Sequence, residues 1–246
     1  MLERCSIFES MRSYNKEIFK LDEHLERLDE SARTLGVRLS EKEIINFKNK
    51  IESAHKKSAV KNAYIRIAVP LLSRKPQIII KNINPYPQKF YKKGISIMTA
   101  VTRRQNALVS FVKSSDYLPG ISAVMDTPGD PEAIMLNERG FVSEATVSNI
   151  FIVKDRRLLT PFSYAALLNG ITRQHVFNLA AALDINVIEQ DFTRHDVYNA
   201  DECFLTNTTM EIMPVVRVDK RKIGKGKPGK ITKELMKRFH KVVPRD

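Results

Sequence analysis

Apolar residues recur along the chain with two different periods. Helical spacing is clear over 21–35, where Gly36 follows as a stop signal, and it returns over 41–57. Residues 62–69 alternate instead, as strands do, so Tyr64 and Arg66 share the face opposite to the apolar side chains. The first part of the chain therefore predicts two amphipathic helices followed by a half-buried strand.

The rest of the chain mixes the same two patterns. Periodicity is lost over 102–110, which we interpret as a connection between two lobes, 1–102 and 108–246. The expected fold class is α+β. Strands are predicted at 77–83, 95–101, 133–136, 147–153, 158–160, 186–191, 202–205 and 212–218, with a loop at 85–88 and helices at 115–124, 171–183, 193–199 and 231–242.

Composition narrows the class of protein. The 246 residues can bury a substantial core, and no apolar run is long enough to span a bilayer. No signal peptide is visible at the start. Only Cys5 and Cys203 are present, which argues against a disulfide framework or a zinc site. These features predict a cytoplasmic protein with no membrane partner and no metal.

The net charge of +13 raises the question of nucleic-acid binding. The basic residues are spread along the chain, and no helix-turn-helix, zinc-finger or RNP-like pattern accompanies them. The densest run, 219–233, resembles a turn that leads into a tail helix, where solvated charge is common. We therefore expect no nucleic-acid partner. A positive field also suits phosphorylated cofactors and carboxylate substrates.

The densest chemical signal is a composite motif in the second half of the chain. Residues 144–151 read EATVSNIF, 158–160 read LLT, and 168–173 read LNGITR. Together, with both gaps, they resemble the signature of the class IV pyridoxal-phosphate aminotransferases. The resemblance extends to VKSSDYL at 112–118, FLTNTT at 204–209 and HLERL at 24–28. It implies the two-lobed fold of branched-chain aminotransferase-like enzymes, pyridoxal 5'-phosphate as cofactor, and a homodimer with its site between the lobes.

The resemblance assigns Lys113 as the lysine that bonds to the cofactor and then moves the substrate proton. Its neighbours Phe111 and Val112 are apolar, a setting in which an amine can act as a nucleophile. Glu144 would face the pyridine nitrogen and keep it protonated, which makes the ring a better electron sink. Without the motif, both residues would be interpreted as ordinary surface or strand-end charges. Asn149 is expected to support this site through a hydrogen bond.

Phosphate contacts are implied at three places. Gly170 opens a predicted helix, so the backbone at Ile171 and the hydroxyl of Thr172 suit a phosphate. Thr208 matches a second phosphate-binding threonine, and Arg27 matches the arginine of the family. By itself, Arg27 would be a helix-surface residue that pairs with Glu23. Tyr117 corresponds to the tyrosine that hydrogen-bonds the phenolic oxygen of the cofactor.

Substrate contacts are implied at Phe8, Tyr64 and Arg66, and at the backbone of Thr208 and Thr209, which would receive a carboxylate. Branched-chain enzymes carry a matching Tyr-Ile-Arg segment. The D-amino-acid branch has Arg-x-His instead, whereas Ala68 stands two residues after Arg66 here. The chain is thus expected to act on L-amino acids.

One departure from the family concerns the start of the chain. Relatives begin about thirty residues earlier, with opening strands and a Tyr-Gly turn, whereas this sequence enters near the IFES motif at 7–10. We expect a first lobe that lacks those strands, with one wall of the substrate pocket missing.

The leading functional hypothesis is amino transfer between an L-amino acid, plausibly branched-chain, and 2-oxoglutarate. Two alternatives stay open. The chain could be a 4-amino-4-deoxychorismate lyase, which uses the same cofactor to eliminate pyruvate. It could also be a catalytically impaired, truncated relative that dimerises or binds the cofactor without turnover.

Overall fold

The structure, a computed structural model, describes residues 5–105, 107–115 and 118–244. By its internal contacts the chain divides into two compact units. The first comprises Met1–Pro85, Phe111–Tyr117 and Val242–Asp246, and the second comprises Tyr86–Ser110 and Leu118–Lys241. The two lobes predicted at 1–102 and 108–246 therefore have different bounds in the structure, and each unit is described separately.

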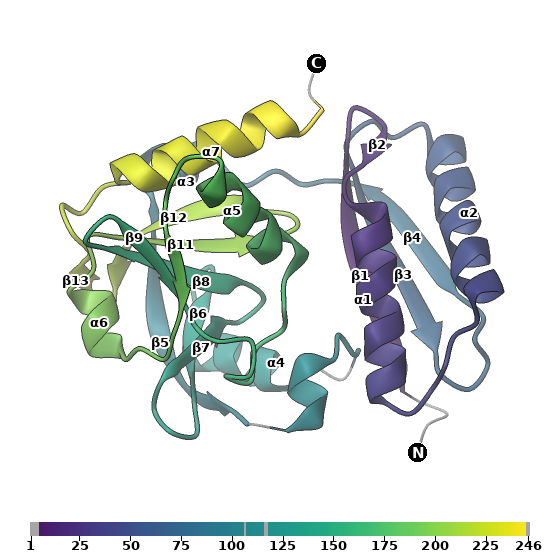
Figure 1. Ribbon diagram of the computed structural model, residues 1–246, viewed down its shortest axis with the longest axis horizontal. Coiled ribbons are helices and arrows are strands. Elements are labelled where there is room, and N and C mark those ends of the chain that lie inside the picture. The colour runs from purple at the N-terminus through teal and green to yellow at the C-terminus, as the bar shows by residue number, and fades with distance from the viewer. Residues whose placement is uncertain (1–4, 106, 116–117, 245–246) are drawn as a thin grey trace. The chain divides into compact units, whose positions relative to one another are not determined.

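A four-stranded antiparallel sheet with the order β2-β1-β3-β4 forms the first unit (Figure 1). Two helices cover one face of this sheet, because α1 packs on β1 and α2 packs on β3 and β4. The elements are β1 (Ser6–Tyr14), β2 (Glu17–Ile18), α1 (Leu21–Thr34), α2 (Glu41–Ser58), β3 (Ala63–Pro70) and β4 (Gln77–Asn82).

The central strand β1 was not predicted from the hydrophobic pattern. Its buried positions alternate as Ile7, Glu9, Met11 and Ser13, so two polar residues interrupt the apolar stripe. The opposite positions, including Phe8, are only half-buried. A strand with polar residues on its buried face is difficult to recognise from sequence, because alternation of apolar and polar residues is the signal used.

A nine-stranded mixed sheet forms the second unit, with the order β10-β9-β8-β11-β12-β5-β6-β7 and β13 paired to β12. Its strands are β5 (Ile95–Arg104), β6 (Ala133–Asn137), β7 (Val142–Ala145), β8 (Asn149–Lys154), β9 (Arg157–Thr160), β10 (Val187–Glu189), β11 (Glu202–Asn207), β12 (Glu211–Val218) and β13 (Arg221–Lys222). Its helices are α3 (Gln88–Lys93), the short 3-10 helix η2 (Leu108–Phe111, which ends one residue into the first unit), α4 (Leu118–Asp126), α5 (Ile171–Ala181), α6 (Arg194–Tyr198) and α7 (Lys230–Val242, whose last residue belongs to the first unit).

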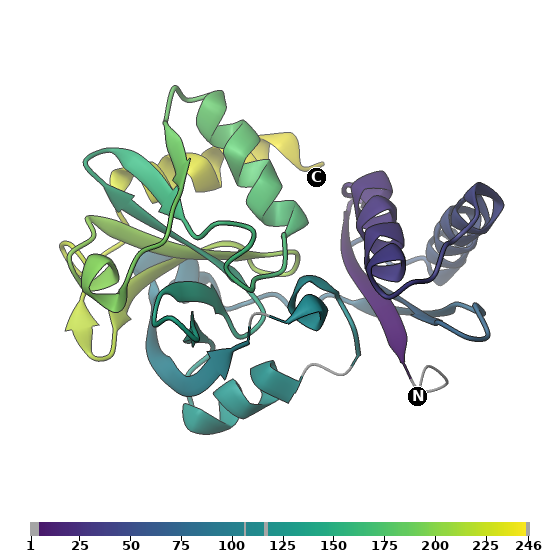
Figure 2. The ribbon, with the colours of Figure 1, turned by 60° about the horizontal axis from the view of Figure 1, so that its bottom comes forward.

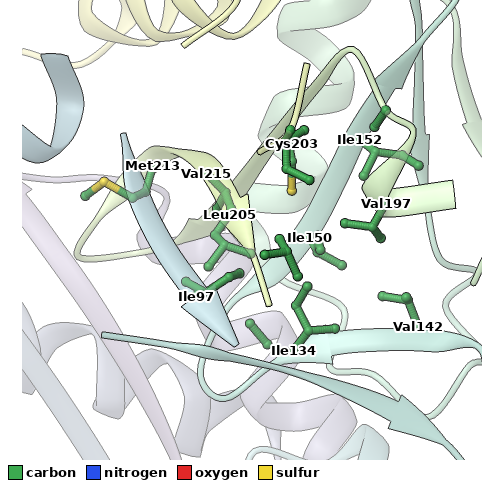
Figure 3. Close-up of a cluster of buried hydrophobic side chains, with 14 of the residues drawn as sticks. Ile97, Ile134, Val142, Ile150, Ile152, Val197, Cys203, Leu205, Met213 and Val215 are labelled. Carbon is green, nitrogen blue, oxygen red and sulfur yellow. The ribbon is translucent and has the colours of Figure 1, made fainter. Parts of the chain in front are cut away.

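The core of the second unit lies between its strands and α6. Figure 3 shows side chains of β5, β6, β7, β8, β11 and β12 converging with Val197 of α6. Cys203 is buried within this cluster, which makes it a packing residue rather than a reactive thiol. Each fully buried aliphatic side chain contributes roughly 1.5–3 kcal/mol. The sheet is thus a rigid support for the turns at its ends.

Pairing explains why the bounds of the units differ from the predicted lobes. Strand β5 is parallel to β12 on one side and to β6 on the other, so 95–104 belongs with the second unit. Conversely, the segment from Lys113 to Ser115 runs along β1: the Phe8 N–H donates to the Lys113 carbonyl at 2.9 Å, and the Ser115 N–H donates to the Ser6 carbonyl at 2.9 Å. This segment therefore belongs with the first unit.

Most other elements agree with the predicted ones to within a few residues. The short elements β2, α3, η2, β7 and β13 were not predicted, and α3 lies next to the predicted loop at 85–88. Helix α4 begins later than predicted and packs against β5 and β6 (Figure 2). Over the described residues, every helix is too short or too polar to cross a bilayer, and no cluster of possible metal ligands occurs there.

Candidate functional site

Lys113 is fixed to the first unit by its backbone and lies beside an aromatic ring. Its Nζ is 5.0 Å from the ring centroid of Phe8, and the guanidinium carbon of Arg66 is 3.9 Å from the same centroid. A Phe ring that contacts two cations orients both of them through its negative faces. Phe8, Arg66 and Lys113 therefore form one cationic cluster on the half-buried face of β1 and β3.

Two hydroxyl groups extend this cluster along the strands. The Ser10 Oγ lies 3.0 Å from the Tyr64 Oη, and Arg66 donates to the Ser115 Oγ at 3.4 Å. Ser10 pairs with Arg66 in the β1–β3 register, so these side chains share one face of the sheet. A carboxylate substrate suits such a surface, which offers cations and hydroxyl donors around an apolar ring.

The opposite face of β1 carries a buried ionic network. Glu9 is completely buried, and it accepts from the Arg27 Nε at 2.7 Å and from the Arg27 Nη2 at 2.8 Å. The His24 Nδ1 lies 2.8 Å from the same carboxylate. The alternative pairing of Arg27 with Glu23 was wrong: Glu23 pairs with Lys20, whereas Arg27 points inward from α1.

The ionisation of this network follows from its burial. Burial opposes ionisation of Glu9, but the charge of Arg27 and the hydrogen bond with His24 outweigh it and hold the pKa of the Glu9 carboxyl below its ordinary value. Burial lowers the pKa of His24, and the charges of Arg27 and Lys113 add to that effect against the opposing influence of Glu9. At neutral pH the network thus contains an ion pair and a neutral imidazole.

In the second unit, Glu144 lies at the end region of β7 with only 5% of its surface exposed. Its carboxylate forms an ion pair with Arg104 at 2.8 Å and accepts the N–H of Leu168 at 3.1 Å. Arg104 also donates to the carbonyls of Ala166 and Ser110, each at 2.9 Å. Arg104, which the sequence pattern left within a connecting segment, fixes both the charge and the orientation of Glu144.

Asn149 connects Glu144 to the start of α5. Its Nδ2 donates to the Leu168 carbonyl at 2.8 Å, so Leu168 is held by Glu144 at its N–H and by Asn149 at its carbonyl. A Cβ placed on Gly170 would lie 2.1 Å from the Asn149 Oδ1. The glycine is therefore required for close packing of the loop, and the expected supporting role of Asn149 has a structural basis.

The start of α5 fits an anion. Gly170 is the N-cap, no side chain caps the helix, and no acidic residue occupies its first turn. The backbone N–H groups at Ile171 and Thr172 are thus available to an anion, and the Thr172 side chain is buried beside them. A buried carboxylate and an uncapped helix start lie on one short loop, as the ring nitrogen and the phosphate of pyridoxal phosphate require.

The turn between β11 and β12 carries Thr208 and Thr209. The N–H of Thr209 donates to the Asn207 Oδ1 at 2.9 Å, and the N–H of Met210 donates to the same oxygen at 2.8 Å. A substrate carboxylate expected at the Thr209 backbone would therefore have to replace the Asn207 side chain there. Thr208 is half-buried on the same turn.

A further buried carboxyl supports this turn. Glu132 accepts from Ser148 Oγ at 2.5 Å, from the Val147 N–H at 3.2 Å and from the Thr146 hydroxyl. Asn207 in turn donates to the Ser148 Oγ at 2.9 Å. Burial raises the pKa of Glu132, although these hydrogen bonds lower it in part. The sequence analysis did not single out Glu132 or Asn207.

The predicted site residues are thus divided between the units. Phe8, Arg27, Tyr64, Arg66 and Lys113 lie in the first, whereas Glu144, Ile171, Thr172, Thr208 and Thr209 lie in the second. Tyr117 falls outside the residues that the structure describes. Glu9, His24 and Arg104 were missed. The one available signal was the polar phase of Glu9 between Ile7 and Met11, because a buried carboxylate implies a partner.

We expect Gly170→Ala to destabilise the second unit by about 1–3 kcal/mol, because the added methyl group meets the Asn149 Oδ1. Asn149→Ala removes that oxygen, so the double variant should be less destabilised than the sum of the two single variants. The measurement is the free energy of unfolding for all four proteins. Additive effects would contradict a direct clash between the two residues.

Glu132→Gln should alter how stability depends on pH. Because the folded pKa of Glu132 is raised above its ordinary value of 4.5, its stabilising contribution is complete below that value and is lost as pH rises through the folded pKa. The advantage of the wild type over the variant, measured by denaturant unfolding, should therefore shrink with rising pH. An advantage that grows with pH would show that the hydrogen bonds favour the ionised form.

Comparison with known proteins places this geometry in a family. Residues 6–218 match the family model "Amino-transferase class IV". A Methanocaldococcus jannaschii protein, whose name marks it as a candidate branched-chain-amino-acid aminotransferase, is 37% identical over 95% of this chain and 85% of its own length. The branched-chain-amino-acid aminotransferase of Pseudomonas aeruginosa is 32% identical, with coverage of 96% and 83%. The D-alanine aminotransferase of Bacillus licheniformis is 31% identical, with coverage of 93% and 84%.

Solved structures give the same result. The branched-chain amino acid aminotransferase of Escherichia coli superposes with a TM-score of 0.89 at 29% identity, over 96% of this chain and 85% of that chain. A second branched-chain amino acid aminotransferase, from T.th. and solved with pyridoxamine 5'-phosphate, has a TM-score of 0.86 at 27% identity, with coverage of 96% and 84%. On the family match, the relatives and the shared fold, this chain belongs to the class IV aminotransferase family.

Proposed function

We propose that the protein catalyses pyridoxal-phosphate-dependent amino transfer between an L-amino acid, in particular a branched-chain one, and 2-oxoglutarate. The observation that carries the proposal is the loop from Leu168 to Gly170. It joins a buried, arginine-paired carboxylate, Glu144, to the uncapped start of α5. Relatives named as branched-chain aminotransferases support the choice of substrate.

Each end of the cofactor has suitable residues. Glu144 would hold a proton on the pyridine nitrogen, and the ion pair with Arg104 keeps that carboxylate charged and oriented. The backbone at Ile171, the hydroxyls of Thr172 and Thr208, and the guanidinium of Arg27 would receive the phosphate. When bound, pyridoxal phosphate supplies an electron sink for the charge left on the substrate carbon.

Lys113 would bond to the cofactor until a substrate amine displaces it, and then move the proton at the substrate α-carbon. Phe8 favours both roles, because its ring holds the Lys113 amine on the half-buried face of β1. Amino acid and 2-oxoglutarate would thus give the matching 2-oxo acid and glutamate.

The cationic cluster suits the substrates. Phe8 offers an apolar contact for an aliphatic side chain, while Arg66 and Tyr64 offer donors for a carboxylate. We propose that Arg66 receives the second carboxylate of 2-oxoglutarate, so that one surface accepts both substrates in turn. The same residues line an L-specific pocket in our proposal, since Ala68 replaces the histidine of the D-amino-acid branch.

Lys113→Ala should abolish the visible absorption band that the wild type develops with pyridoxal phosphate, and it should lower amino transfer from leucine to 2-oxoglutarate by at least roughly 10²–10⁴-fold. Glutamate and 2-oxo acid are measured together, with Lys81→Ala as the control because Lys81 is exposed on β4. A Lys113→Ala protein that keeps the band and its turnover would disprove the assignment.

The same assay separates the two alternatives. Pyruvate formed from 4-amino-4-deoxychorismate without any amino acceptor would replace the transferase proposal by a lyase. A normal absorption band with neither glutamate nor pyruvate formed would identify a binding-competent but inactive relative.

We also propose that the protein is a homodimer. Helix α4 exposes Leu118, Ile121, Val124 and Met125, and the neighbouring β5 exposes Val101. The backbone N–H of Thr102 donates to Asp126 at 2.7 Å, which places the end of α4 beside Val101. A contiguous apolar stripe of this kind marks an interaction surface in a soluble protein, and a second copy would cover it by symmetry.

Ile121→Glu with Met125→Lys should convert the dimer to a monomer, because it places charges in the apolar stripe. Light scattering should then give a mass near 28.2 kDa instead of about twice that value. Ile45→Lys, at an exposed apolar position on α2, is the control that should stay dimeric. If the α4 variant keeps the dimer mass, the interface lies elsewhere.

A further inference from the structure

The buried network behind β1 is larger than an arginine needs for solubility or packing. Glu9 accepts four hydrogen bonds: two from Arg27, one with the His24 Nδ1, and one from the N–H of Ser10 at 3.2 Å. Bidentate pairing with a carboxylate fixes the plane of a guanidinium group as well as its position. The plane of Arg27 is thus set by Glu9, and Glu9 is set by His24 and by its own strand.

The network is also coupled to the face that carries Lys113. Glu9 follows Phe8 in β1, so the same two residues reach Arg27 on one face and the Lys113 amine on the other. The charge of Lys113 contributes to the lowered pKa of His24, which shows that the lysine lies within electrostatic reach. Strand β1 therefore relates the position of Arg27 to that of Lys113.

We infer that Glu9 and His24 are positioning residues that hold Arg27 ready for the phosphate group of the cofactor. This inference rests on the proposed function, in which Arg27 receives that phosphate. Glu9 fixes the guanidinium through its two hydrogen bonds, and His24 holds the Glu9 carboxylate in the matching orientation. Neither residue is required to touch the cofactor.

Two other roles for Glu9 make different predictions. If Glu9 only fastens α1 to β1, its loss weakens binding of any ligand that needs the folded unit, with or without a phosphate. If Glu9 only neutralises Arg27, its loss leaves an uncompensated positive charge and strengthens phosphate binding. Only the positioning role predicts a selective loss of the contribution that the phosphate makes.

The test compares pyridoxal phosphate with pyridoxal, which lacks the phosphate but keeps the aldehyde. Visible absorption titrations give the dissociation constants of both ligands for the wild type, Glu9→Gln, Arg27→Gln and the double variant. We expect Glu9→Gln to reduce the preference for the phosphorylated ligand by about tenfold or more, since hydrogen bonds to charged groups contribute at that level. The double variant should show no greater loss than Arg27→Gln alone.

His24 provides a second series in case Glu9→Gln fails to fold. His24→Ala should reduce the same preference, and His24→Asn, whose amide nitrogen can replace the Nδ1, should restore it. Glu23→Gln is the control, because Glu23 pairs with Lys20 on the surface of α1. Thermal unfolding of each apoprotein reports the purely structural effect.

Equal losses for both ligands, a stronger binding of pyridoxal phosphate, or additive effects of Glu9→Gln and Arg27→Gln would each overturn the inference. Those results leave the proposed function intact, because the wild type still binds the cofactor at Lys113. A wild type that gives no absorption band with either ligand would instead overturn the proposed function and this inference with it.

Discussion

Two carboxylates, Glu9 and Glu144, are almost completely removed from water, and each is paired with an arginine that is itself buried. Burial of an unpaired charge costs several kcal/mol, so neither arginine can be lost without a large penalty. The two pairs fix the backbone around them: Glu9 lies in the central strand of the first unit, and Glu144 holds the loop that precedes α5. The polar interior of each unit is therefore organised around a single ion pair.

This constraint explains how short turns keep a defined geometry without helices or sheets around them. The loop 165–170 is held by Ser143, Glu144 and Asn149, all from or beside the strands of the second sheet, and by Arg104 from β5. The turn at Thr208 is held in a similar way by Asn207, Ser148 and Glu132. A rigid sheet thus presents two anion-compatible turns with little conformational freedom to lose when a ligand binds.

Sequence predicted the elements whose buried positions are apolar and the motif residues whose spacing resembles a family. Helices α1 and α2 and strand β3 are examples of the first kind. It failed where burial is polar. Strand β1 was missed because Glu9 and Ser13 break its pattern, and Arg104 was left in a connection because its partner, Glu144, lies far along the chain. Partners of buried charges depend on tertiary contacts, which local periodicity does not contain.

The bounds of the units have a consequence for the reactive lysine. Residues on both sides of the Lys113 segment belong to the second unit, yet the backbone from Lys113 to Ser115 is hydrogen-bonded to the edge of β1. That edge would otherwise expose unpaired N–H and C=O groups. Covering it with the lysine segment satisfies the strand and places the amine beside Phe8 in the same step. The position of the lysine is therefore determined by strand pairing in the first unit rather than by the sheet that carries Glu144.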